Sequence, residues 1–213
     1  MNADCTVPKD KTGRTDERME DLLHEMEAYA ARHHVPIINE RGRRAFLDIV
    51  QQERPHRVLE IGTAIGYSTL LLLLHGAADV TVTTLELSEE RAQLAKGFWA
   101  RAGLLGRVDL RTGNAGDILT ELTGPYDFVF IDAAKGQYVD YFHKIQPLLA
   151  PRCTILADNV LFRGYVLGPE RAPRRYRTIV KRLRAYITLV NHTPGFSTEI
   201  LERGDGLAVT RRK

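Results

Sequence analysis

The chain has 213 residues, of which 44% are hydrophobic and 27% charged, with a formal net charge of +3 at pH 7. These values predict one soluble globular domain with a full core and exclude low-complexity and disulfide-rich chains. No apolar run reaches the length of a membrane span, and the polar N-terminus lacks the apolar core of a signal peptide. We therefore expect a cytoplasmic protein without membrane contact. The two cysteines, Cys5 and Cys153, have no metal-ligand spacing, which also favours a reducing compartment.

The first 53 residues are predicted to form a tail and two helices. Residues 1–15 are polar and charged, and we expect a disordered tail there. From residue 16 apolar residues recur at helical spacing, and the helix should end before Pro36, which disfavours helix at the preceding residue. A second helix is expected from about Asn39 to Gln52. Both helices should pack at the sheet edge or form a lid, within a single domain of residues 16–213.

The stretch around two glycines, residues 58–68, is the centre of the prediction. An apolar β-type run leads to Glu60, Gly62 and Gly66 follow four residues apart, and an apolar run then continues to Leu74. This pattern predicts a strand, a glycine turn and a helix, which open a doubly wound α/β fold. In such folds a ligand lies at the helix N-terminus, and glycines let the backbone approach it. A purely structural turn is the alternative for this stretch taken alone.

The spacing of the two glycines separates two classes of nucleotide-binding protein. A dinucleotide fingerprint would read G-x-G-x-x-G, whereas this chain has G-x-x-x-G after a glutamate, which disfavours a dehydrogenase. The run E-I-G-T-A-I-G-Y-S, residues 60–68, resembles motif I of the class I S-adenosylmethionine (SAM) methyltransferases. This resemblance implies SAM contacts from the turn, which we assign to Glu60, Gly62, Ile65, Tyr67 and Ser68.

Two further strands are expected to end in residues that face the same crevice. The Val- and Thr-rich run 79–85 leads to Glu86, where an acid accepts hydrogen bonds from ribose hydroxyls in nucleoside-binding folds. The alternative is an acid that only precedes the next helix, since Ser88 begins a capping pattern. After a short third strand, Asn114 and Ala115 should contact adenine. Related methyltransferases commonly carry aspartate where this chain has Asn114.

The fourth and fifth strands are followed by oxygen-bearing side chains. The strand at 126–132 ends in Asp132, and the strand at 153–157 is followed by Asp158 and Asn159. Neighbouring parallel strands would deliver these three side chains to one rim of the sheet. Oxygen ligands without His or Cys favour a hard octahedral cation such as Mg²⁺. Taken singly, each acid could instead cap the helix that follows it.

The C-terminal part is predicted to complete the sheet. A helix is expected from Tyr141 to Leu149, stopped by Pro151. Strands at 196–201 and 207–210 are joined by so short a turn that they must form a hairpin, which makes the last strand antiparallel. The predicted fold class is therefore α/β, with a doubly wound seven-stranded, mostly parallel sheet and an antiparallel last strand.

A basic segment separates the fifth strand from this hairpin. Pro173 should open a helix in its favoured first-turn position, with one apolar and one basic face. From Arg163 to Arg184 there are eight basic residues and one acid, Glu170. A solvated helix face is the simplest interpretation, and contact with the phosphates of RNA is the functional one.

Three motifs together resemble the metal-dependent O-methyltransferases of the catechol and caffeoyl-CoA type. They are the glycine motif, I-D-A-A-K-G-Q-Y at 131–138 and D-N-V-L at 158–161. The wider pattern, with H-V-P-I at 34–37 and G-D-G-L-A at 204–208, is similar to the bacterial tRNA 5-hydroxyuridine methyltransferases. The resemblance covers about residues 20–213. It implies a seven-stranded sheet, SAM as methyl donor, Mg²⁺ and a homodimer.

The resemblance also implies roles for single residues. Asp132, Asp158 and Asn159 would hold Mg²⁺, with Asp132 also close to SAM, and Lys135 would accept the proton or stabilise the oxyanion. A surface lysine is the alternative for Lys135. The predicted substrate is the 5-hydroxyl of 5-hydroxyuridine at the tRNA wobble position. The predicted contacts to the anticodon loop are Arg163, Arg174, Arg175 and Arg177.

Two other functions compete with this one. A small catechol or phenol could be the substrate, and the sequence separates this function from the first one only by the basic helix, which an enzyme for a small substrate does not need. A non-catalytic RNA-binding protein with a vestigial SAM fold is disfavoured by the intact set of Asp132, Lys135, Asp158 and Asn159.

Overall fold

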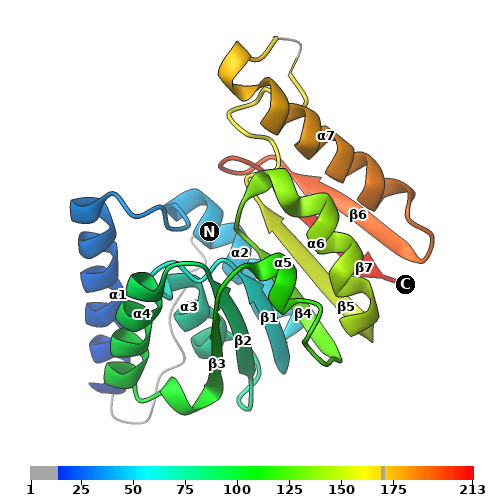
Figure 1. Ribbon diagram of the computed structural model, residues 1–213. Helices are drawn as coiled ribbons and strands as arrows, with labels where there is room; N and C mark the ends of the chain where they lie inside the picture. The colour runs from blue at the N-terminus through cyan, green and yellow to red at the C-terminus, as the bar shows by residue number, and fades with distance from the viewer. Residues whose placement is uncertain (1–13, 169–170) are drawn as a thin grey trace, which may run out of the picture.

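A seven-stranded sheet runs through the centre of the molecule in the order β3-β2-β1-β4-β5-β7-β6 (Figure 1). The computed structural model describes residues 14–168 and 171–213. Strands β1 to β5 are parallel, whereas β7 is antiparallel to both of its neighbours, β5 and β6. The predicted fold class is therefore confirmed. The strands are β1 (Arg57–Ile61), β2 (Thr81–Glu86), β3 (Val108–Thr112), β4 (Tyr126–Ile131), β5 (Leu149–Asp158), β6 (Phe196–Leu201) and β7 (Leu207–Arg212).

Helices cover both faces of this sheet (Figure 1). They are α1 (Arg14–His33), α2 (Glu40–Glu53), α3 (Tyr67–His75), α4 (Glu89–Ala102), α5 (Ala115–Ile118), α6 (Tyr138–Ile145) and α7 (Arg177–His192). Short 3₁₀ turns are η1 (Leu105–Arg107), η2 (Lys135–Gln137), η3 (Gln146–Leu148) and η4 (Arg174–Tyr176). In the part of the chain that the structure describes, no helix has the length and apolar character needed to cross a membrane.

The two faces bury different sets of side chains because strand residues alternate in direction. Val58 and Phe130 pack with helices α1 to α4, whereas Leu59 and Ile131 pack with α5 to α7. Phe46 of α2 lies 4.8 Å from the Phe130 ring, centroid to centroid. Helix α2 thus covers a face of the sheet, which corrects the prediction that the N-terminal helices pack at its edge.

Several predicted boundaries differ from the observed ones. Helix α1 begins at Arg14, and the rest of the predicted tail, with Cys5, lies outside the described residues. The predicted helix 141–149 is wrong at both ends, since α6 begins at Tyr138 and ends at Ile145. Pro147, which cannot donate a helical hydrogen bond, falls in η3 and ends the helix. Pro151 instead lies inside β5, beside a register shift in its pairing with β4, where an unpaired residue is tolerated.

Candidate active site

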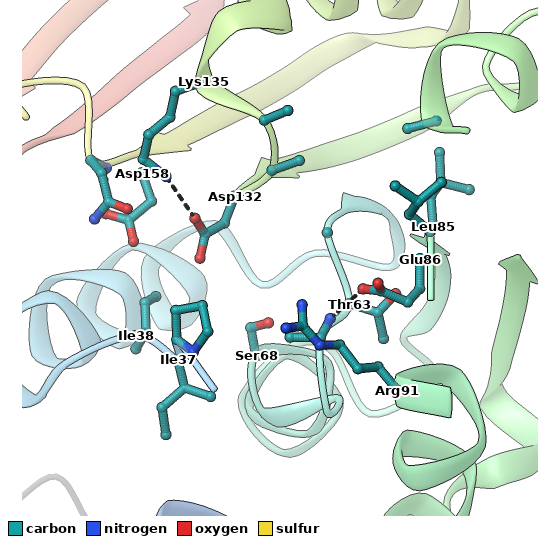
Figure 2. A pocket seen from close by; sticks show the side chains of 18 of the residues that line it. Ile37, Ile38, Thr63, Ser68, Leu85, Glu86, Arg91, Asp132, Lys135 and Asp158 are labelled. Atoms are coloured by element: carbon teal, nitrogen blue, oxygen red, sulfur yellow. Dashed lines mark hydrogen bonds and ion pairs between the residues drawn. The ribbon is translucent and has the colours of Figure 1, made fainter. Parts of the chain in front are cut away.

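A cavity of about 380 Å³ lies at the carboxyl ends of β1, β2, β4 and β5 (Figure 2). The strand order reverses between β1 and β4, and the cavity occupies this switch point, where ligands bind in open α/β sheets. Most of the predicted site residues line it. They are Gly62, Tyr67, Ser68, Glu86, Asn114, Ala115, Asp132, Lys135, Asp158 and Asn159.

The glycine turn is fixed by close packing inside the protein. Gly62 has φ +103°, and a Cβ there would collide with the carbonyl oxygen of Asp132. Gly66 has φ +81°, and a Cβ would lie 2.6 Å from the indole of Trp99, whose Nε1 donates to the Gly66 carbonyl at 3.0 Å. Both positions therefore require glycine. The turn brings bare backbone to the cavity next to Asp132.

Glu60 lies behind the cavity wall and not in it. Its carboxylate is fully buried and accepts hydrogen bonds from the hydroxyls of Ser68 at 2.6 Å, Thr84 at 2.5 Å and Thr69. Burial raises the pKa of Glu60 to about 7, although these three hydroxyls oppose the shift. Ile65 is also fully buried and absent from the cavity wall. These two predicted SAM contacts are thus corrected, and Glu60 instead supports the turn that carries Ser68.

Glu86 combines a buried carboxylate with an apolar neighbour. One carboxylate oxygen accepts from the backbone N–H of Ala64 at 2.8 Å and the other from that of Ser88 at 2.9 Å. A carboxylate has about four acceptor sites, so two remain for a ligand. Leu87 beside it lines the cavity with 75% of its surface exposed. A polar acceptor next to an uncovered apolar surface suits a nucleoside, with hydroxyls on one side and a ring on the other.

Helix α4 is capped by a residue other than Glu86, which bears on the alternative interpretation of Glu86 as an acid that only precedes this helix. The cap of α4 is Ser88, whose hydroxyl accepts from the Arg91 N–H at 3.3 Å. Asn114 similarly caps α5, because its side-chain oxygen accepts from the Gly116 N–H at 2.8 Å. The amide NH₂ of Asn114 is left to face a ligand.

The acidic rim, which we define as Asp132, Asp158 and Asn159, forms the opposite wall (Figure 2). Burial, followed by the charge of Asp132, raises the pKa of Asp158 to about 7. Asn159 has φ +55°, in the left-handed region that asparagine tolerates, and its N–H donates to the Asp158 carboxylate at 2.7 Å. Lys135 Nζ lies 3.5 Å from an Asp132 carboxylate oxygen. The donors are all oxygens of the kind that a hard cation prefers.

This donor set is small. Within residues 14–168 and 171–213, no three His, Cys, Asp or Glu side chains come together in a way suited to a metal ion. A cation at the acidic rim would therefore depend on two carboxylates, one amide and oxygens from water or substrate. That arrangement is common for Mg²⁺, which keeps several waters.

The four predicted RNA contacts lie outside the cavity. Arg163, Arg174, Arg175 and Arg177 are all exposed. The guanidinium groups of Arg163 and Arg175 lie 5.5 and 4.6 Å from the centroid of the Tyr176 ring. Helix α7 itself reaches the site, because Arg182 donates to the carbonyl of Gly136, the residue after Lys135, at 3.3 Å. Glu170, the one acid of this segment, lies outside the described residues.

One wall of the cavity was missed by sequence reasoning. The segment from Pro36 to Asn39, between α1 and α2, faces the acidic rim (Figure 2). The helices on either side of this segment are joined through Tyr67, whose hydroxyl donates to Glu27 of α1 at 2.5 Å and accepts from Arg43 of α2 at 2.8 Å. Leu87, Arg91 and Tyr141 also line the cavity unpredicted. The segment between the two helices therefore lines the cavity, whereas the prediction concerned the helices themselves.

Comparison with known proteins agrees with this geometry. A protein-family model described as O-methyltransferase matches residues 13–213. The chain belongs to the O-methyltransferase family. A catechol O-methyltransferase of Niastella koreensis is 39% identical over 57% of this chain and 58% of its own length. Caffeoyl-CoA O-methyltransferase 1 of Arabidopsis thaliana is 30% identical over 72% of this chain and 62% of its own length.

The matches cover unequal parts of the relatives. The chain spans about three fifths of the length of these two curated relatives. A solved O-methyltransferase of Bacillus cereus, in complex with SAH, superimposes with a TM-score of 0.80 at 30% identity, over 99% of this chain and 94% of the other. The family is thus the SAM-dependent one of the catechol and caffeoyl-CoA type, and the Mg²⁺ site stays a prediction.

Proposed function

We propose that this O-methyltransferase transfers the methyl group of SAM to an aromatic hydroxyl that has a neighbouring oxygen, in a small phenol of the catechol type. The observation that carries the proposal is the meeting of two walls in one cavity. The glycine turn with Glu86 lies on one side, and the acidic rim with Lys135 lies on the other. The relatives named for catechol and caffeoyl-CoA methylation support the same substrate class.

The first wall fits SAM. Gly62 lines the cavity where the turn packs against the Asp132 backbone, Ser68 lines it as well, and Glu86 keeps free acceptor sites beside the exposed Leu87. SAM, when bound, supplies a methyl group on a positively charged sulfur. The chain's part is to hold that group in line with the acceptor and away from water, which accounts for much of the rate of such a reaction.

The second wall fits a divalent cation, which Asp132, Asp158 and Asn159 would hold. Such a cation supplies positive charge that favours the ionised form of a nearby hydroxyl and prefers two adjacent oxygens. Lys135 Nζ, held 3.5 Å from the Asp132 carboxylate, is the group of this chain that would take the hydroxyl proton as a neutral amine, or face the oxyanion as an ammonium. The segment at Pro36–Asn39 would cover the substrate from the open side.

Product analysis tests this proposal. The purified protein is incubated with SAM, Mg²⁺ and either catechol or caffeate, and the products are separated and identified by mass spectrometry. We expect one methyl group per molecule, on one of the two adjacent hydroxyls. Failure to methylate any vicinal dihydroxyphenol at millimolar concentration, by a protein that binds SAM, would contradict the small-phenol proposal.

A second candidate substrate is 5-hydroxyuridine at the tRNA wobble position. It is favoured by the basic surface, which we define as Arg163, Arg174, Arg175 and Arg177. Its 5-hydroxyl and 4-carbonyl give the same pair of adjacent oxygens. The exposed guanidinium groups of Arg163 and Arg175 both lie close to the Tyr176 ring, and α7 contacts the residue next to Lys135. A base from a single-stranded loop could be splayed into the cavity while arginines hold the phosphates outside.

A matched pair of charge reversals separates the two candidates. The variant R174E/R175E alters the basic surface, whereas R54E/R152E makes the same charge change at the opposite ends of the strands. If tRNA is the substrate, R174E/R175E should weaken tRNA binding and flatten its salt dependence, and R54E/R152E should not. Catechol methylation should be the same in both. Equal tRNA binding by both variants at low salt would remove the RNA role from this surface.

A further inference from the structure

Tyr138 lies directly beneath the acidic rim, as the first residue of α6. Its side chain is fully buried, and its hydroxyl lies 3.0 Å from the carbonyl oxygen of Asp158 and 3.3 Å from that of Ile131. These carbonyls belong to the last residues of β5 and β4. One hydroxyl proton is thus shared between the ends of two neighbouring strands, with Asp158 as the nearer acceptor.

The two strand ends need such a link because their ladder stops short of the rim. The last paired residues of β4 and β5 are Ile131 and Ala157. Beyond them each strand is held from its outer side, since the Asp132 N–H donates to the Ile61 carbonyl of β1 at 3.0 Å and Asp158 pairs with β7. The Tyr138 hydroxyl spans the gap between the two strand ends.

The bridged carbonyls are one peptide bond away from the groups of the acidic rim. The Ile131 carbonyl carbon is bonded to the nitrogen of Asp132, and that of Asp158 to the nitrogen of Asn159. A change in the separation of these carbonyls therefore moves the rim oxygens relative to one another.

A second buried tyrosine provides an internal comparison. The ring of Tyr186 packs against that of Tyr138 edge to face, with centroids 5.4 Å apart. Tyr186 is fully buried as well, but its hydroxyl has no hydrogen-bond partner among the residues that the structure describes. The two side chains have equal size and burial, and they differ in what the hydroxyl contacts.

We infer that Tyr138 is a positioning residue whose hydroxyl sets the separation of the two strand ends, so that Asp132, Asp158 and Asn159 can bind one divalent cation. The inference rests on the proposed metal site. Residues that orient ligands without touching the ion typically change metal affinity 10- to 100-fold when they are removed. A role confined to core packing would leave the metal affinity unchanged.

The test compares Tyr138→Phe with Tyr186→Phe, which remove one hydroxyl each from the same cluster and keep both rings. Mg²⁺ binding and SAM binding are measured by calorimetry, with thermal unfolding as a check of the fold. We expect the Mg²⁺ dissociation constant of Tyr138→Phe to rise about tenfold, with SAM affinity within twofold of wild type. Tyr186→Phe should bind Mg²⁺ like wild type.

Each alternative result has a distinct meaning. Mg²⁺ binding by wild type and equal Mg²⁺ binding by Tyr138→Phe would overturn the positioning role and leave the proposed function intact. Absence of Mg²⁺ binding in wild type would overturn both. Incorporation of 4-aminophenylalanine at position 138, which restores a donor, covers the case in which Tyr138→Phe does not fold. This variant should bind Mg²⁺ within about threefold of wild type, and a tenfold loss there would also contradict the inference.

Discussion

The two walls of the cavity, the glycine turn with Glu86 (the turn side) and the acidic rim, differ in how their carboxylates are stabilised. On the turn side, Glu60 lies behind the wall and accepts hydrogen bonds from three hydroxyls, whereas Glu86 in the wall accepts from two backbone N–H groups and keeps acceptor sites for a ligand. On the acidic rim, Asp132 and Asp158 lie close enough that one raises the pKa of the other, and Lys135 sits 3.5 Å from Asp132. The carboxylates of the turn side accept hydrogen bonds from the protein itself, whereas the two neighbouring carboxylates of the acidic rim carry negative charge that a cation would neutralise.

Because of this difference, we expect substitutions in the two walls to impair different properties of the protein. Changes on the rim should abolish chemistry and spare SAM binding, because no backbone donor of the turn depends on the rim carboxylates. Changes on the turn side should alter stability or SAM affinity and spare cation binding.

Asp158→Asn should lower methyl transfer about 10³-fold, because loss of one anionic donor removes several kcal/mol of charge stabilisation from the site. SAM affinity should stay within twofold of wild type. The matched control is Asp140→Asn, an exposed acid that pairs with Lys144 and does not line the cavity. Turnover is followed by mass spectrometry and SAM binding by calorimetry. A parallel loss of SAM binding in Asp158→Asn would break the separation of the walls.

Lys135→Met should lower the rate about 10²-fold, in the range of a positioned proton acceptor. Binding of SAM and of Mg²⁺ should be retained, since the Lys135 side chain is neither one of the proposed ligands of the cation nor part of the turn. Lys144→Met, which removes an exposed ion pair of α6, is the control. A rate reduction below threefold across the pH range would leave Lys135 as a bystander.

Glu60→Gln should remove a pH dependence of stability. The folded pKa of Glu60, about 7, lies above its ordinary value of 4.5, so the folded chain holds a proton that the unfolded chain has released. The stability is therefore fully present below pH 4.5 and is lost as the pH rises through 7. The loss for wild type relative to Glu60→Gln should be on the order of 3 kcal/mol between these limits.

Urea unfolding of both proteins at pH 4.5, 6 and 8 measures this difference, with Glu90→Gln, an exposed acid of α4, as the control. If the free energies of unfolding of wild type and Glu60→Gln differ by the same amount at all three pH values, the pKa of Glu60 is the same in the folded and the unfolded chain. The hydrogen bonds from the three hydroxyls would then offset the effect of burial. In that case the hydrogen bonds stabilise the charged carboxylate of Glu60 as much as burial destabilises it.

Glu86→Gln should weaken SAM binding about tenfold, which corresponds to one charge-assisted hydrogen bond. Mg²⁺ binding should be unchanged, because Glu86 belongs to the turn side. Calorimetry with SAM and with Mg²⁺ on the same preparation measures both, and Glu90→Gln again serves as the control. Wild-type SAM affinity in Glu86→Gln would remove this carboxylate from the cofactor site.

Most of the predicted residues line one cavity because the reasoning that singled them out is local. The glycine turn, Glu86 and the acidic rim each lie at the carboxyl end of a strand, and parallel strands carry such residues to one edge of the sheet. Glu60 and Ile65 were misplaced because a motif does not say which of its residues face inward.

The remaining features depend on contacts between segments far apart in the chain. The wall at Pro36–Asn39 is set by the packing of α1 and α2, with Tyr67 joined to Glu27 across 40 positions. The partners of the Tyr138 hydroxyl come from two strands. The end of α6 was missed for a simpler reason, since Pro147 was overlooked in favour of Pro151.

The central claim is that the two walls act together on a hydroxyl with a neighbouring oxygen. The most direct measurement compares methyl transfer from SAM to catechol and to phenol, which differ by that one oxygen, in Mg²⁺ and in EDTA. The account predicts monomethylated catechol in Mg²⁺ only, and no detectable methylation of phenol in either condition. Equal methylation of phenol and catechol, or full activity on catechol in EDTA, would contradict it.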